Sequence, residues 1–248
     1  MAAAMARGWA GGGGGPDAMA FTDTGSGNAV ELAREVGGEA ASGNRELAAG
    51  CDVVVLAFKP DGLDAVGGEL GGRAPVVLSL LGATSLDQLE AAFPEAPVIR
   101  LMPNVAVELG EGTLCYALGE RAGGEPAERV LGLLAPLGRA VEVPDRLIDA
   151  ATAIMGCSPA YFALVAEALE GAGAQEGLDE SLAHDLVAES MAGTAALLRD
   201  RDALAIRRAV ASPGGSTAAG LAALERGAAR EAFTDAVRAS LERMRGAA

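Results

Sequence analysis

The chemistry-bearing stretch of this chain is a run of small residues, Ser-Pro-Gly-Gly-Ser-Thr at 212–217, set between two alanine-rich helical patterns. Gly214 and Gly215 permit backbone conformations closed to other residues. A helix beginning near Ser216 would leave its first amides free, and free amides together with the helix dipole favour an anion. The run predicts either a cradle for a small carboxylate, with the Thr217 hydroxyl beside it, or an ordinary turn capped by Ser216.

Three further polar positions lie beside segments that resemble strands. Lys59, the only lysine, follows the apolar run 53–58 and is either a solvated lysine or a positive charge at a ligand site. Asn104 follows another strand and presents both a donor and an acceptor. Asn44 precedes a helical pattern and is either an ordinary N-cap or a ribose contact.

Other familiar chemistries do not fit this sequence. His184 is the only histidine, and it lies within a helical pattern without a recognisable nucleophile or acid partner. The three cysteines are far apart and lack metal-ligand spacing, so neither a disulfide framework nor a metal site is expected. No phosphate-binding loop ending in Gly-Lys-Ser/Thr occurs. A reaction carried by a cofactor fits these residues better.

Charge and composition restrict the partners. The formal net charge of -15 repels nucleic acid and anionic membranes, so neither is expected as the main partner. No apolar run was found to reach the roughly 18 residues that a membrane span needs, and the N-terminal residues lack the apolar core of a signal peptide. These features, with the cysteine usage, predict a cytoplasmic protein.

The elements that must position the polar residues alternate through residues 1–143. Apolar runs at 18–23, 52–58, 75–81 and 96–102 predict strands, and helical patterns separate them. Further strands are expected at 112–118 and 139–143, with a helix near 125–137 between them. This alternation is typical of a Rossmann-like α/β domain, a parallel sheet covered by helices. Ligands of such sheets bind beyond the carboxyl ends of the strands.

From residue 144 onward the pattern becomes alanine-rich and helical without a convincing strand. Broad apolar faces predict a second, all-α domain over 144–248. Either a compact monomeric bundle or contact with a second subunit would bury these faces. The expected helices are 145–154, 159–174, 179–199, 202–210, 216–226 and 229–245.

The chain resembles the pyrroline-5-carboxylate reductases, the enzymes of the last step of proline synthesis. Residues 204–233 resemble the family's long C-terminal signature. The stretches 44–60, 98–112 and 152–169 follow the family's order and spacing, so the resemblance covers nearly the whole chain. It implies an N-terminal Rossmann domain that binds NADPH or NADH, a helical C-terminal dimerisation domain, and reduction of 1-pyrroline-5-carboxylate to L-proline by hydride transfer.

The resemblance also implies roles for individual residues. The substrate carboxylate would be held at Gly214 and Gly215 with Ser212 nearby, and the catalytic Thr217 would contact the ring nitrogen. Asn44 would meet the cofactor ribose. The remaining cofactor-binding residues would be Ala57, Phe58, Lys59, Pro60, Met102, Pro103 and Asn104. A protonated imine is already electrophilic, so positioning is the expected main catalytic contribution.

Two departures from the family pattern bear on the cofactor. The family's glycine-rich turn after its first strand runs Gly-x-Gly-Asn-Met, and this chain begins at the Met of that pattern, which makes Met1 a cofactor-binding position. The first strand and the leading glycines would thus be missing, through either a misassigned start or a true truncation. Asp23 lies near the end of the strand expected at 18–23, which corresponds to the second strand of the family. Its carboxylate suits the free ribose hydroxyls of NAD and repels the 2′-phosphate of NADP, while neighbouring hydroxyls could receive that phosphate.

Two alternatives to the reductase follow. One is a catalytically impaired, oligomerising paralogue that has lost dinucleotide binding together with the first strand. The other is a related imine or 2-hydroxy acid reductase with the same two-domain architecture. An altered Ser-Pro-Gly-Gly-Ser-Thr run would favour the related reductase, and here the run is intact.

Overall fold

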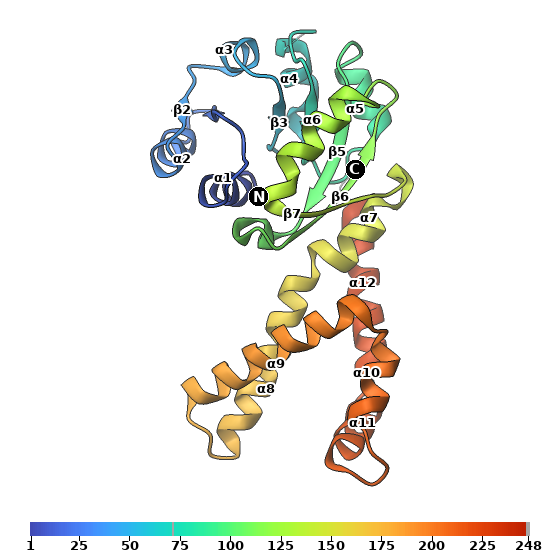
Figure 1. Ribbon diagram of the computed structural model, residues 1–248. Helices are drawn as coiled ribbons and strands as arrows, with labels where there is room; N and C mark the ends of the chain where they lie inside the picture. The colour runs from blue at the N-terminus through green and yellow to red at the C-terminus, as the bar shows by residue number, and fades with distance from the viewer. Residues whose placement is uncertain (71, 247–248) are drawn as a thin grey trace. The chain divides into compact units, whose positions relative to one another are not determined.

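The computed structural model describes residues 1–70 and 72–246, which form two compact units. The first unit comprises Met1–Cys157 together with the C-terminal residues from Ser240, and the second comprises Ser158–Ala239 (Figure 1). This division by contacts lies later in the sequence than the boundary at 143/144 expected from the pattern, and that boundary remains a prediction.

The first unit alternates helices and strands up to its sixth strand. Its elements up to residue 103 are α1 (Ala2–Gly11), β1 (Ala20–Phe21), α2 (Asn28–Val36), β2 (Glu39–Ala40), α3 (Asn44–Ala49), β3 (Val54–Leu56), η1 (Pro60–Gly62), α4 (Leu63–Leu70), β4 (Val77–Ser79), α5 (Leu86–Ala92) and β5 (Val98–Pro103). The remaining elements before residue 157 are η2 (Val105–Leu109), β6 (Gly112–Leu118), α6 (Glu125–Leu134), η3 (Ala135–Leu137), β7 (Gly138–Glu142), η4 (Asp145–Leu147), α7 (Ile148–Ala151) and the π-helix η5 (Thr152–Gly156).

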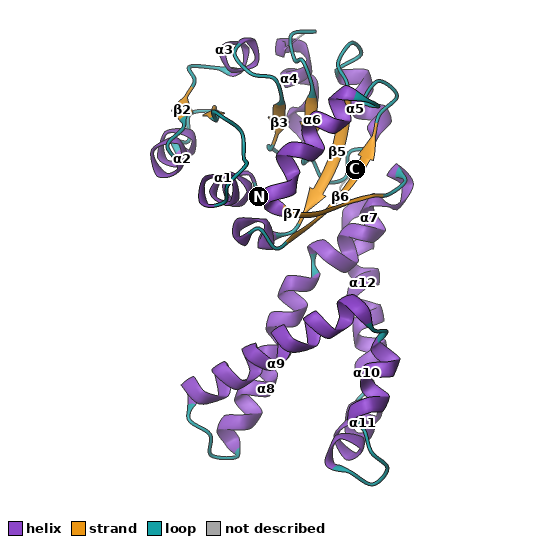
Figure 2. Cartoon of the chain, in the orientation of Figure 1, coloured by secondary structure: helices purple, strands orange, loops and turns teal. Residues whose placement is uncertain are grey.

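Five strands form the main sheet in the order β3-β4-β5-β6-β7 (Figure 2). Neighbours are parallel except β5 and β6, which pair antiparallel. The expectation of a wholly parallel sheet was therefore wrong at this pair. The cause is the connection through η2, which is too short for the crossover of a dozen or more residues that a parallel return requires.

The strand expected at 18–23 is reduced to the two residues of β1. β1 pairs in parallel only with β2, in a separate two-stranded sheet, and none of the hydrogen-bonded ladders among the described residues joins this pair to β3. The described strands thus form two separate sheets, with a break between β1 and β3.

Apolar clusters cover both faces of the five-stranded sheet, as the continuous apolar runs predicted. Successive side chains of β5 point to opposite faces, so Val98 and Met102 join one cluster while Ile99 and Leu101 join the other. Helix α5 begins with a capping box in which Ser85 and Gln88 satisfy each other's backbone amides. This packing fixes the carboxyl ends of β3, β4 and β5 side by side.

The second unit consists of helices. They are α8 (Ser158–Gln175), α9 (Glu180–Asp200), α10 (Ala203–Val210), α11 (Ser216–Arg226) and most of α12 (Ala229–Arg245), whose last turns belong to the first unit. Their bounds agree closely with the expected helices. The expected helix 145–154 is instead a succession of short 3₁₀, α and π turns, from η4 through η5.

One helical stretch differs from the expectation that no apolar run is long enough to span a membrane. Helical residues Asp145–Gln175 are long and apolar enough, by length and composition alone, to cross a membrane, and little of this stretch is buried within the chain. The expectation that no such run exists was therefore wrong on this measure. The absence of a membrane partner remains a prediction.

Candidate functional site

The Ser-Pro-Gly-Gly-Ser-Thr run forms a tight loop before α11. Gly214 has a φ of +73°, a left-handed conformation that side chains other than glycine rarely adopt. The Gly215 amide donates to the Ser212 carbonyl oxygen at 3.0 Å. A Cβ on Gly215 would lie only 2.6 Å from the Ser212 hydroxyl oxygen. The backbone conformation at Gly214 therefore favours glycine, while a side chain at Gly215 would have to displace the Ser212 hydroxyl.

The N-terminus of α11 carries no side-chain cap. Gly215 is the N-cap residue, and Ser216 is already the first helical residue, so the alternative in which Ser216 caps the helix was wrong. No acidic side chain occupies the first turn. Ser212 and Thr217 are both exposed beside the loop. The loop therefore presents free amides and hydroxyls, the combination that suits a carboxylate.

A second group of predicted residues follows β3. Ala57, Lys59 and Pro60 are exposed, whereas the Phe58 ring is half-buried against the apolar cluster on one face of the sheet. Lys59 is the N-cap residue of η1, and its extended backbone precedes the proline that begins this 3₁₀ turn. Lys59 is therefore exposed just beyond the carboxyl end of β3, and whether it meets a ligand remains a prediction.

The end of β5 contributes a third group. Met102 and Pro103 are buried, with Met102 inside an apolar cluster. Asn104 is half-buried, and its side-chain amide donates to the Met155 carbonyl oxygen at 3.3 Å. Its Oδ1 accepts from the Thr113 amide at 3.2 Å. Asn104 thus joins three segments of the chain at the edge of the sheet.

Asp23 closes the loop between β1 and α2. Its carboxylate accepts from the amides of Gly25 (2.7 Å) and Ala29 (2.9 Å) and from the Ser26 hydroxyl (2.8 Å). These hydrogen bonds, the Ala29 amide first, hold the pKa of Asp23 below its ordinary value. Gly27 is the N-cap residue of α2 and has no side chain to cap the helix, so Asp23 satisfies the Ala29 amide instead.

Asn44 is the first residue of α3, and Gly43 is the N-cap residue. The N-cap alternative for Asn44 was therefore wrong. Its side-chain amide instead donates to the Glu69 carboxylate of α4 at 2.9 Å. Asn44 follows β2 as Asp23 follows β1, so both residues come from the carboxyl ends of the two-stranded sheet.

The N-terminus of α1 fits a dinucleotide phosphate. Met1 is half-exposed and is the N-cap residue, with no side-chain cap and no acidic residue in the first turn. Helix α1 packs against η2, which directly follows β5. Free amides of a helix at the carboxyl side of a Rossmann-like sheet are the usual phosphate site. The residues present thus fit part of a dinucleotide site, and the glycine turn of the family pattern is not among them.

The structure gathers the cofactor candidates and the substrate candidates on different units. The positions at 1, 23, 44, 57–60 and 102–104 belong to the first unit, and those at 212–217 belong to the second. The assigned roles of all these residues remain predictions.

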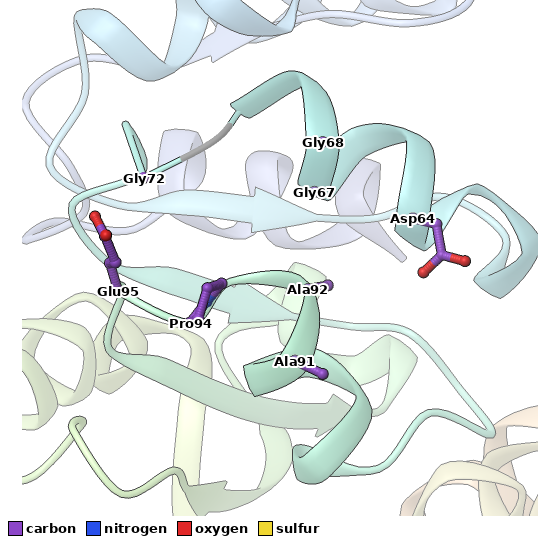
Figure 3. A pocket seen from close by; sticks show the side chains of 8 residues that line it. All are labelled: Asp64, Gly67, Gly68, Gly72, Ala91, Ala92, Pro94 and Glu95. Atoms are coloured by element: carbon purple, nitrogen blue, oxygen red, sulfur yellow. The ribbon is translucent and has the colours of Figure 1, made fainter.

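A shallow hollow of about 450 Å³ lies elsewhere on the first unit (Figure 3). Its lining residues are Asp64, Gly67, Gly68, Gly72, Ala91, Ala92, Pro94 and Glu95. They come from α4, α5 and the segments that precede β4 and β5, so the hollow lies toward the amino ends of these strands, away from the candidate site. Nowhere in residues 1–70 and 72–246 do three or more His, Cys, Asp or Glu side chains form a group that could hold a metal ion.

Two family models match the chain. The model described as pyrroline-5-carboxylate reductase dimerisation matches residues 145–247, and the model described as NADP oxidoreductase, coenzyme F420-dependent, matches residues 1–81. The two matched ranges correspond broadly to the helical half of the sequence and to the first part of the α/β half.

Curated relatives and solved structures agree with these models. Pyrroline-5-carboxylate reductase of Synechocystis sp. is 37% identical over 204 residues, which cover 81% of this chain and 76% of the relative. The Thermus thermophilus enzyme of the same name is 38% identical over 77% of this chain and 73% of its own. The structure of Plasmodium falciparum pyrroline carboxylate reductase with NADP bound superposes with a TM-score of 0.88 at 28% identity, covering 98% of this chain and 93% of that one.

Proposed function

Because this chain belongs to the pyrroline-5-carboxylate reductase family, we propose that it reduces 1-pyrroline-5-carboxylate to L-proline with a nicotinamide dinucleotide. The observation that carries the proposal is the loop 212–217. Its helix N-terminus without a side-chain cap and the left-handed backbone of Gly214 suit a small carboxylate held by backbone amides.

The reaction needs little acid or base from the protein. NADPH or NADH supplies a hydride to the imine carbon, and the C=N double bond becomes a C–N single bond with a secondary amine. Thr217 would donate or accept a hydrogen bond at the ring nitrogen. The carboxylate would be held at Gly214 and Gly215, where the Gly215 amide would exchange its bond to the Ser212 carbonyl oxygen for one to the substrate. An uncharged threonine is a weak acid, so the substrate is protonated from solvent before the hydride arrives. Positioning supplies most of the rate.

The first unit would hold the cofactor. The amides at the start of α1, next to Met1, would bind the pyrophosphate, and Asn44 would meet the ribose. Ala57–Pro60 and Met102–Asn104 would line the nicotinamide side at the carboxyl ends of β3 and β5. Because the side chains of Met102 and Pro103 are buried, these two residues would act through their backbone and through the surface they support.

NADPH is the proposed physiological reductant. An NADP oxidoreductase model matches residues 1–81, and the Plasmodium falciparum relative was solved with NADP bound. Asp23 alone would oppose the 2′-phosphate by charge, but its carboxylate already accepts three hydrogen bonds within its own loop. Thr22 and Thr24, its neighbours in the sequence, carry hydroxyl groups, which are suitable donors to a phosphate.

A second copy of the chain is the proposed partner. The matched dimerisation model covers residues 145–247, and α8 and α9 expose the apolar side chains of Phe162, Leu164, Leu169, Leu182 and Leu186. Burial of such a surface in a dimer would remove it from water. The same burial would account for an apolar helical stretch without a membrane, and we propose that the enzyme is cytoplasmic.

The experiment is to mix purified protein with 1-pyrroline-5-carboxylate and NADPH or NADH, follow the loss of reduced nicotinamide absorbance, and identify proline by mass spectrometry. Gly215→Ala should raise the KM for the imine because its methyl group would displace Ser212. Gly220→Ala is the matched control, since a Cβ there meets nothing within 4 Å. A folded dimer that forms no proline would favour the impaired paralogue, and turnover of other imines or of 2-hydroxy acids alone would favour the related reductase.

A further inference from the structure

Arg100 is a charged residue on an apolar face of the sheet. Its neighbours on the same face of β5, Val98 and Met102, belong to one apolar cluster, and Ala117, its partner on β6, belongs to the same cluster. The Arg100 side chain is only 4% exposed. An arginine buried without partners would be strongly unfavourable, so Arg100 needs negatively charged partners that stay close to its guanidinium.

Two carboxylates from one short segment neutralise this guanidinium. Arg100 Nη1 lies 2.9 Å from Asp145 Oδ1, and Nη2 lies 2.8 Å from Asp149 Oδ1. Between these two acids in the sequence lies Ile148, which is fully buried in the same apolar cluster. The second oxygen of Asp145 accepts from the Leu86 amide at the start of α5. Arg100 therefore clamps η4 and α7 onto the middle of β5.

A second attachment joins the same two segments further along. Asn104, at the end of β5, donates to the Met155 carbonyl oxygen in the π-helix η5. Arg100 and Asn104 thus hold residues 145–155 against β5 at both ends. π-turns inside helices occur frequently at functional sites, and this one directly precedes the helix that enters the second unit.

We propose that Arg100 is a positioning residue for the reduction: through its two carboxylates it sets the orientation of Met102–Asn104 and of the segment 145–156. The inference rests on the proposed function, in which Met102–Asn104 line the nicotinamide side. Arg100 is buried and acts through these residues. A small displacement of either segment should lower mainly the rate of hydride transfer, since misplacement of reacting groups by about 1 Å can cost on the order of 100-fold in rate.

The test compares Arg100→Met, Arg100→Lys and Asp149→Asn in the full-length protein. Arg129→Met is the matched control, because Arg129 also pairs with two carboxylates, Asp52 and Glu125, but is exposed. Four quantities are measured for each variant: kcat, the Kd of NADPH, the isotope effect with NADPH deuterated at the transferred position, and hydrogen exchange of peptides covering 145–157.

In Arg100→Met we expect kcat to fall by about tenfold or more while the Kd of NADPH changes by less than about threefold. The isotope effect should rise as hydride transfer becomes rate-limiting, and exchange at 145–157 should quicken. Arg100→Lys and Asp149→Asn keep part of the clamp and should lie between Arg100→Met and the parent protein. These milder variants decide the question if Arg100→Met does not fold.

Equal kcat values in the three clamp variants and in Arg129→Met would overturn the proposal. So would a kcat loss that matches only the loss of folded protein, with an unchanged isotope effect. If the parent protein binds NADPH but reduces no imine, the proposed function fails. Hydrogen exchange at 145–157 still decides whether Arg100 is a clamp, because that measurement needs no turnover.

Discussion

Gly8 of α1 packs directly against Val107 of η2: a Cβ added to Gly8 would stand 2.2 Å from the Val107 carbonyl oxygen. This close approach fixes α1 against the segment that follows β5. It therefore connects the proposed phosphate-binding helix to the proposed nicotinamide edge of the sheet. The contact involves backbone, which cannot move aside as a flexible side chain would.

Gly8→Ala should destabilise the protein by about 1–3 kcal/mol, as overpacking in a close-packed region does. Chemical denaturation followed by circular dichroism measures the effect. Gly11→Ala is the matched control in the same helix, where a Cβ meets nothing within 4 Å. Alanine there should be neutral or stabilising, because it lowers the entropy of the unfolded chain. Equal stabilities for the two variants would mean that α1 does not pack tightly on η2.

Thr217→Ala should lower kcat strongly and leave the fold intact. The side chain is exposed at the first turn of α11, so its loss removes a hydroxyl beside the proposed ring nitrogen without creating a cavity. Thr234→Ala is the control, because Thr234 is exposed on α12 and its hydroxyl donates to the Arg230 carbonyl oxygen of the same helix. This variant should leave kcat unchanged. Normal turnover by Thr217→Ala would remove this residue from the mechanism.

Asp23→Ser should shift the ratio of kcat/KM values toward NADPH, because it removes a negative charge from the proposed ribose end of the site. Steady-state kinetics with both cofactors give this ratio. Asp17→Ser changes the net charge equally at another exposed position before β1 and controls for long-range effects. An unchanged ratio would mean that Asp23 serves only its own loop.

The same carboxylate should make stability depend on pH. The pKa of Asp23 is lowered in the folded protein, by the Ala29 amide, the Ser26 hydroxyl and the Gly25 amide in that order. Its stabilising contribution is therefore complete above the ordinary carboxyl pKa and is lost as the pH falls through the lower folded-state value. Denaturation midpoints at several acidic pH values should fall less steeply in Asp23→Asn than in the parent. Parallel slopes would contradict this assignment.

The sequence predicted the repeating elements well because their signals are local. The apolar runs around β3, β4 and β5 and the alanine-rich helices of the second unit were expected close to their observed bounds. The antiparallel return of β6 was missed because pairing direction depends on the length of a connection, which the apolar pattern does not encode. The succession of turns over 145–156 was missed because its short 3₁₀, α and π turns follow one another without a break, so the sequence pattern resembles one helix.

For the candidate site, the sequence located loops but not the contacts within them. The loop at 212–217 could be anticipated because proline fixes one backbone dihedral and glycine permits conformations closed to other residues. The bond from Asn44 to Glu69 and the clamp from Arg100 to Asp145 and Asp149 join residues distant in the chain. Such partners become visible only when the sheet brings its strands together.

The interruption of the sheet has a consequence for how the protein behaves in concentrated solution. β3 pairs with β4 on one side, and no ladder of the described strands joins its other side. A strand edge without a partner strand can promote aggregation unless another property of the protein, such as its charge, opposes association. The net charge of -15 makes copies repel one another at neutral pH. Solubility should therefore collapse on acidification toward the isoelectric point near 4.5, and added salt should promote the same association by screening the repulsion.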